Sequence, residues 1–153
     1  SRDGSVCIWR ADDGYPECRL KGHGPVTAYA WSPDSTVLAS AGEDYTLRFW
    51  TIGTDVQVCA QTNHDSEVIS CNWSADGRSV ATGSRDGTLR IWDAQTGRER
   101  FRFLHTPNGA IRFREGRVDG AGAEAWRELG WQVSDEYGYR ILPAETFGPL
   151  PPL

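Results

Sequence analysis

The sequence predicts an all-β fold built from a four-stranded unit that repeats about every 41 residues. "SRDGSVCIW" at the start of the chain returns as "SRDGTLRIW" at residues 84–92, and the looser "GEDYTLRFW" occupies residues 42–50. The closing tryptophans of these three stretches, Trp9, Trp50 and Trp92, lie 41 and 42 residues apart. Such a fixed period indicates a repeat architecture.

Several other residue types keep this period. The series are Asp3, Asp44 and Asp86; His23, His64 and His105; Trp31 and Trp73; and Cys18 and Cys59. Between them lie short runs of β-branched and aromatic residues bounded by Asp-Gly, Ser and Pro, which are typical of strands joined by tight hairpins. In the best-defined unit the expected strands are 67–73, 78–84, 88–92 and 98–103.

The Gly-His start at residues 22–23, the first turns Ser-Pro-Asp and Ser-Ala-Asp-Gly and the Trp-Asp end in "IWDA" together resemble WD repeats. The resemblance covers residues 1 to about 105 and implies four-stranded β-propeller blades. We therefore expect a partial WD-repeat β-propeller of about three and a half blades with an extended C-terminal tail.

The period also suggests where the parts of the chain begin and end. We expect the last two strands of an incomplete blade at 1–23, one blade at 24–64, another at 65–105, a degenerate final blade at 106–144 and a Pro-rich tail at 145–153. Residues 121–131 fit a strand of the final blade, but Ala121, Ala125 and Leu129 would also share one face of a short helix. Both alternatives stay open.

The sequence begins in mid-blade and contains no methionine, which favours the C-terminal portion of a longer protein. A propeller typically needs about four to eight blades to close its ring and cover its strand edges. Two completions are open: further blades in cis, or a second copy of the chain in trans.

By resemblance to WD repeats, four polar side chains in each blade form one hydrogen-bonded network. These are His23, Ser40, Asp44 and Trp50 in one blade and His64, Thr82, Asp86 and Trp92 in the next. The carboxylate would orient the imidazole, the imidazole would meet a hydroxyl, and the hydroxyl would accept the indole N–H. Because the set recurs in each blade, we expect a structural network and no catalytic triad.

The remaining chemistry of the sequence predicts a non-catalytic chain without metal or cofactor. No Cys-x-x-Cys pair supplies a zinc framework, and Gly-x-Ser-x-Gly and phosphate-loop motifs are absent. We expect the cysteines to be small buried residues in a reduced, cytoplasmic setting; they are Cys7, Cys18, Cys59 and Cys71. No apolar run approaches the ~20 residues of a membrane span.

The charge pattern favours a protein or peptide partner over nucleic acid. The net charge is −5, and the densest basic cluster, "RERFR" at 98–102, fits the solvated face of an outer strand. By resemblance, the residue before each turn aspartate faces the partner, and the loops before the first strands add further contacts. The candidate partner-binding residues are Arg2, Glu43, Arg85, Pro25, Asp65 and Glu67.

The segment "AWRELGWQV…YRILPAETFGPLP" resembles the closing segment of bacterial WD-repeat proteins. Those proteins carry a NACHT- or STAND-type NTPase, a caspase-like domain or a TIR domain upstream. The resemblance implies a binding and sensing module of a larger signalling protein. Two alternatives stay open: a structural half-propeller that closes by homo-oligomerisation, and the non-catalytic half of a propeller whose enzymatic domain lies upstream.

Overall fold

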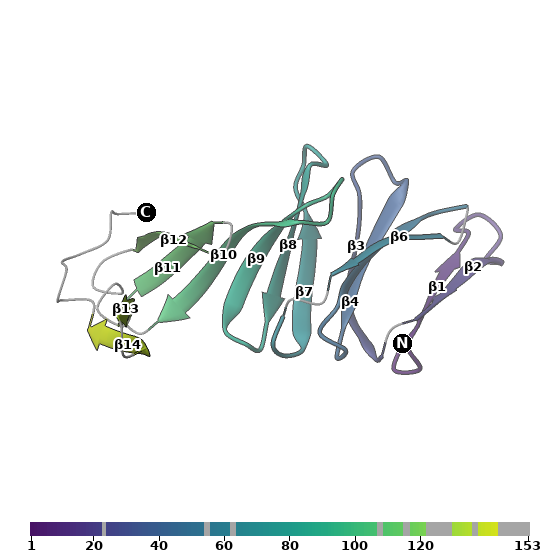
Figure 1. Ribbon diagram of the computed structural model, residues 1–153. Coiled ribbons are helices and arrows are strands. Elements are labelled where there is room, and N and C mark those ends of the chain that lie inside the picture. The colour runs from purple at the N-terminus through teal and green to yellow at the C-terminus, as the bar shows by residue number, and fades with distance from the viewer. Residues whose placement is uncertain are drawn as a thin grey trace. The chain divides into compact units, whose positions relative to one another are not determined.

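The computed structural model describes residues 1–22, 24–53, 56–61, 64–106, 109–114, 117–121, 130–135 and 138–143. These residues form β-strands joined by turns, and they contain no helix (Figure 1). The predicted all-β fold is therefore confirmed. The chain divides into two compact units, Ser1–Arg100 and Phe101–Leu153.

The first unit contains three antiparallel sheets, one for each successive repeat. The first sheet consists of β1 (Ser5–Trp9) and β2 (Pro16–Lys21). The second consists of β3 (Val26–Trp31), β4 (Val37–Gly42), β5 (Leu47–Thr51) and β6 (Val56–Gln61). The third contains β7 (Val68–Trp73), β8 (Ser79–Ser84), β9 (Thr88–Asp93) and the start of β10 (Glu99–Thr106).

Within each sheet, every strand pairs with the next strand along the chain, as expected of consecutive hairpins. The strands β7, β8 and β9 lie within one residue of the expected ranges 67–73, 78–84 and 88–92. The expected strand 98–103 extends further, to Thr106, as β10.

The turn between the first two strands of a repeat is held by one serine and one aspartate. Ser32 Oγ donates to Asp34 Oδ1 at 2.6 Å and accepts from the Val37 N–H at 2.9 Å. Ser74 and Asp76 make the same 2.6 Å bond between β7 and β8. Because these side chains satisfy the backbone locally, the Ser-x-Asp pattern closes the hairpin without help from other strands.

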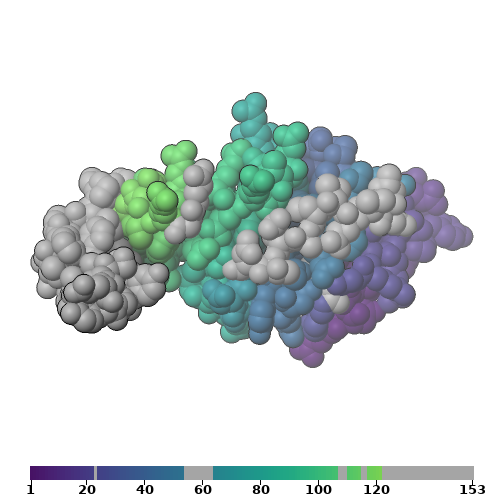
Figure 2. Space-filling view, in the orientation of Figure 1, coloured from purple at the N-terminus to yellow at the C-terminus, as the bar shows by residue number. Residues whose placement is uncertain are grey.

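The second and third repeats share one core. Its buried residues are Ala39, Ala41, Leu47, Phe49, Val68, Cys71, Val80 and Trp92. Two bonds cross from one repeat to the other: Thr27 Oγ1 donates to the Val68 carbonyl, and Trp73 Nε1 donates to the Ala30 carbonyl at 3.0 Å. In Figure 2 the teal surface of the third repeat lies directly against the blue surface of the second.

The second unit contains strands from the region expected to form a degenerate final blade. β10 pairs with β11 (Gly109–Arg114), and β11 pairs with β12 (Arg117–Ala121) around Ile111 and Ala121. β13 (Gly130–Asp135) and β14 (Gly138–Pro143) form a separate two-stranded sheet. Helix and strand were both open for residues 121–131, of which 122–129 lie outside the described residues, as does the tail 145–153. The single blade 106–144 stays a prediction.

Two leucines at the same repeat position test the shared core. Leu47 is 0% exposed within it, whereas the equivalent Leu89 in "TLRIW" is 45% exposed. We expect Leu47→Ala to lower the free energy of unfolding by about 2–5 kcal/mol, because it leaves a cavity. Leu89→Ala should cost less than about 1 kcal/mol. Urea unfolding of both variants measures this, and equal costs would contradict the described packing.

Candidate functional site

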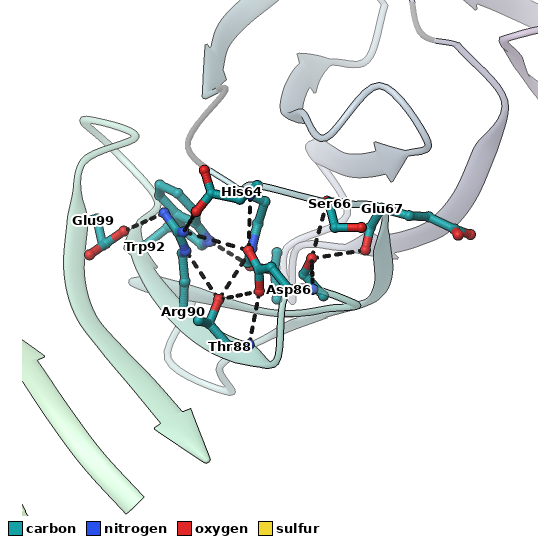
Figure 3. Close-up of polar contacts among 11 residues, drawn as sticks. His64, Ser66, Glu67, Asp86, Thr88, Arg90, Trp92 and Glu99 are labelled. Atoms are coloured by element: carbon teal, nitrogen blue, oxygen red, sulfur yellow. Dashed lines mark hydrogen bonds and ion pairs between the residues drawn. The ribbon is translucent and has the colours of Figure 1, made fainter. Parts of the chain in front are cut away.

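Four residues of the third repeat form a continuous hydrogen-bonded chain (Figure 3). Asp86 Oδ2 lies 2.9 Å from His64 Nδ1, and His64 Nε2 lies 2.8 Å from Thr82 Oγ1. Trp92 Nε1 donates to the same hydroxyl at 2.7 Å. The chain therefore connects the loop before β7 with β8, β9 and the turn between them.

The donors and acceptors of this chain are consistent with one neutral form of His64. Nδ1–H donates to the Asp86 carboxylate, and Nε2 accepts the Thr82 hydroxyl proton while that oxygen accepts from Trp92. Burial lowers the pKa of His64. The charge of Arg90 lowers it further, whereas the hydrogen bond to Asp86 raises it by a smaller amount than burial lowers it. A proton on Nε2 would point at the Thr82 hydroxyl, and Nε2 could then no longer accept the proton of that hydroxyl. Folding therefore favours the neutral ring.

Asp86 is the acceptor at the centre of this site. Burial alone would raise its pKa, but hydrogen bonds from the Thr88 hydroxyl and from His64 outweigh that effect and hold the pKa well below its usual range. The Asp65 N–H also donates to Oδ2 at 3.0 Å. The carboxylate thus remains ionised and holds the loop before β7 to the turn before β9.

Arg90 is a buried arginine of this site that was not among the residues predicted from the sequence. The Arg90 side chain is only 1% exposed, and Nη1 donates to Glu99 Oε2 at 3.0 Å. Its Nη2 lies 3.6 Å from Asp86 Oδ2. The signal was available: in "TLRIW" the two-residue period of a strand places Arg90 on the same face as the buried Trp92.

The second repeat contains part of the equivalent network. Trp50 Nε1 donates to Ser40 Oγ at 2.8 Å, and both residues are buried. Asp44 Oδ1 accepts from the Thr46 hydroxyl at 2.8 Å, and Asp44 Oδ2 accepts from the Gly24 N–H at 3.2 Å. His23, expected to complete this network, lies outside the described residues.

The candidate partner-binding residues lie at the same end of the strands. The Glu43 N–H donates to the Pro25 carbonyl and the Arg85 N–H to the Glu67 carbonyl, each at 2.9 Å, so each turn is tied to the loop before the repeat's first strand. The Val26 N–H donates to the Ser1 carbonyl at 3.1 Å, which ties the turn containing Arg2 to the second repeat. We call this set the turn-end surface: Arg2, Pro25, Glu43, Asp65, Glu67 and Arg85.

Exposure varies across the turn-end surface. The side chains of Asp65 and Arg85 are 88% and 67% exposed, and Arg2 and Glu43 are also exposed. Arg85 Nε lies 2.8 Å from Glu67 Oε2, which is half-buried, as is Pro25. Asp65 Oδ2 also lies 3.7 Å from Nη2 of the buried Arg90. The surface therefore presents both charge signs.

One expectation about the cysteines is wrong. Cys71 is buried, which raises the pKa of its thiol to about 12, and Cys18 is half-buried, but Cys7 is exposed. Cys7 occupies the repeat position of the buried Arg90. The side chain of Cys59 is outside the described part of the chain.

No group of three or more His, Cys, Asp and Glu side chains among the described residues is arranged to hold a metal ion. In the same residues, no helix is long and apolar enough to cross a membrane.

Antiparallel sheets whose strands pair in sequence order, with an internal polar network in the second and third repeats, are typical of the blades of a β-propeller. Residues 14–51 and 56–93 match the family described as "WD domain, G-beta repeat". These two segments are WD repeats, and the fold is a partial WD-repeat β-propeller.

Two relatives share this part of the chain. WD repeat-containing protein 1 of Gallus gallus is 36% identical over 73 residues, which are 45% of this chain and 12% of the relative. WD repeat-containing protein 97 of Homo sapiens is 41% identical over 61 residues, which are 40% of this chain and 4% of the relative. The chain thus spans a small fraction of the length of these relatives.

The pKa of His64 predicts a specific pH dependence of stability. Folding lowers this pKa, so the unfolded chain takes up the proton first, and stability present above about pH 6.5 is lost as the pH falls. The free energy of unfolding falls by at most about 1.4 kcal/mol for each pH unit in that range. We expect His64→Gln to remove this pH dependence, and the control substitution His105→Gln, at an exposed histidine, to keep it. Urea unfolding between about pH 7.5 and 5.5, roughly the range in which histidine titrates, measures both. An unchanged pH dependence in His64→Gln would contradict the assignment.

The burial of Arg90 predicts a large effect of its removal. Arg90→Met removes the buried cation beside Glu99 and Asp86, and we expect the free energy of unfolding to fall by about 3–5 kcal/mol. Arg100 pairs with Asp93 but is 45% exposed, so Arg100→Met should cost about 0–1 kcal/mol. Thermal and urea unfolding compare the two, and a cost below that of Arg100→Met would refute the buried ion pair.

Proposed function

We propose that this chain is a protein-interaction module that binds a partner protein or peptide at the turn-end surface. The observation that carries this proposal is the geometry of that surface: turns and loops of successive repeats end together and expose Arg2, Glu43, Asp65 and Arg85. WD-repeat proteins generally mediate protein interactions, and loops held by a rigid scaffold are suited to recognition.

The mixed charge of the turn-end surface sets the kind of partner. Arg2 has no hydrogen bond or ion pair among the described residues, so its guanidinium is available to an acidic side chain. The Arg85–Glu67 pair is solvent-exposed on the arginine side and contributes little to stability. A partner carboxylate can therefore compete for Arg85, and a partner cation can reach Asp65 and Glu43.

The polar network supports a non-catalytic role. His64 and Asp86 resemble two members of a hydrolytic triad, but Thr82 is buried and its hydroxyl already binds both Trp92 and His64. The network thus fixes the position of the turn-end surface and offers no exposed nucleophile.

The wider setting is also a proposal. The resemblance of the C-terminal segment to bacterial signalling proteins supports a sensing role beside an upstream effector domain, and a cytoplasmic location fits that role. A second role, assembly with further blades in cis or in trans, is supported by the edge of β1, which has no strand partner on one side among the described residues.

The interaction role can be tested with a displayed library of random linear peptides selected on the 153-residue chain. We expect Arg85→Glu to weaken selected peptides about tenfold or more, because it reverses an exposed charge in the turn-end surface. Calorimetry would measure the affinities.

The matched control is Arg78→Glu. Arg78 is exposed in the turn between β7 and β8, at the opposite end of the strands, so binding should change less than about twofold. Peptides that respond equally to both substitutions, or only to Arg78→Glu, would place the interaction elsewhere and reject the proposal.

A further inference from the structure

An open groove of about 320 Å³ lies at the opposite end of the strands from the turn-end surface. It is formed by the turns between β3 and β4, between β7 and β8 and between β9 and β10. The first two turns abut, because a Cβ on Gly77 would lie 3.7 Å from Pro33 Cδ. We call this the inter-turn groove, and the lining residues that matter here are Pro33, Asp34, Val37, Trp73 and Asp76.

The inter-turn groove has an aromatic wall that is held in place. Trp73 is half-buried, and its one polar group, Nε1–H, donates to the Ala30 carbonyl at 3.0 Å. The Trp73 ring also meets the Phe49 ring edge-on, with the two centroids 5.8 Å apart. Because the indole N–H is already bonded, Trp73 offers the groove aromatic carbon, which Pro33 and Val37 extend.

The groove also contains two carboxylates that each have an unused oxygen. Asp34 Oδ1 accepts from the Ser32 hydroxyl at 2.6 Å and from the backbone N–H two residues further on at 3.1 Å. Asp76 Oδ1 accepts in the same way from the Ser74 hydroxyl at 2.6 Å and from a backbone N–H at 3.0 Å. In the described part of the chain, the Oδ2 atom of neither aspartate has a hydrogen-bond or ion-pair partner.

The two carboxylates give the groove a negative charge. Hydrogen bonds from Ser32 to Asp34 and from Ser74 to Asp76 are the main causes that lower the pKa of each carboxyl group. No Lys, Arg or His side chain is among the described residues that line the groove. Arg78 is exposed and forms no ion pair with Asp76 among those residues, although its charge also lowers the pKa of Asp76. The groove therefore has no cation of its own.

We propose that the inter-turn groove binds an arginine side chain of a partner polypeptide. Its guanidinium donates to Oδ2 of Asp34 and of Asp76 and stacks on the Trp73 ring. Arginine suits the groove better than lysine, because the guanidinium is planar, carries five N–H donors and stacks on aromatic rings. The ammonium group of lysine is compact and more strongly hydrated.

This site is separate from the turn-end surface and adds a second point of contact to the proposed interaction role. Every group that it uses belongs to the second and third repeats, which are the two segments matched as WD repeats. Because the groove lies at the other end of the strands, its occupation does not require that the turn-end surface is occupied.

The probe is the capped tripeptide acetyl-Gly-Arg-Gly-amide, titrated into the isotopically labelled 153-residue chain while NMR follows the indole N–H signal of Trp73. Trp73→Phe assigns this signal by removing it. We expect a saturable shift with a dissociation constant on the order of 1 mM. Asp34→Asn and Asp76→Asn should each weaken binding about fivefold, because Asn keeps the acceptor that forms the turn and removes the charge.

Two controls distinguish the groove from general charge attraction. The peptide acetyl-Gly-citrulline-Gly-amide has nearly the same shape without the charge and should bind about tenfold more weakly or worse. Asp12→Asn removes an exposed carboxylate that does not line the groove, so it should change the affinity less than about twofold.

Arg85→Glu, in the turn-end surface, should leave the Trp73 shift unchanged. No saturable shift, equal affinity for the citrulline peptide, or an equal loss in Asp12→Asn would overturn the proposal. Loss of the shift in Arg85→Glu would place the peptide at the turn-end surface, which would overturn this inference and leave the proposed function standing.

Discussion

The hydrogen-bonded chain from Asp86 through His64 and Thr82 to Trp92 is the constraint on which the best-described repeat depends. Each member comes from a different strand, loop or turn, so the chain fixes the positions of these elements together. It is buried, and a buried polar network stabilises a fold only when every donor and acceptor has a partner. The network meets that condition because one neutral tautomer of His64 satisfies every bond in it.

The turn-end surface inherits its geometry from this network. Asp86 accepts the Asp65 N–H. At the same end of the strands, the Ser84 hydroxyl and the Arg85 N–H both donate to the Glu67 carbonyl. The residues available to a partner are therefore held by residues that a partner cannot reach. Such an arrangement lowers the entropy that would be lost when the loops bind.

Much of the fold could be predicted from the sequence because the repeat is periodic. The spacing of Trp50 and Trp92 and the Ser-x-Asp turns located the strands closely. Ser40 and Thr82 each accept the indole N–H of the tryptophan ten residues further on. Arg90 was missed because a charged residue on a strand is normally read as solvent-facing. Only the packing of Glu99 and the His64 loop shows that the position is buried. The exposure of Cys7, and of Leu89 relative to Leu47, depends on neighbouring repeats, which no single repeat sequence reveals.

The two bonds that cross between β3 and β7 have a consequence for how the chain folds. Strand pairing in the first unit joins neighbours along the chain, so each repeat can form its hairpins rapidly and locally. Thr27 and Trp73 instead join one repeat to the backbone of the next. In a linear array, the free energy of such junctions decides whether repeats unfold one at a time or together. Cooperativity of the second and third repeats thus depends on one hydroxyl, one indole and the apolar contacts around them.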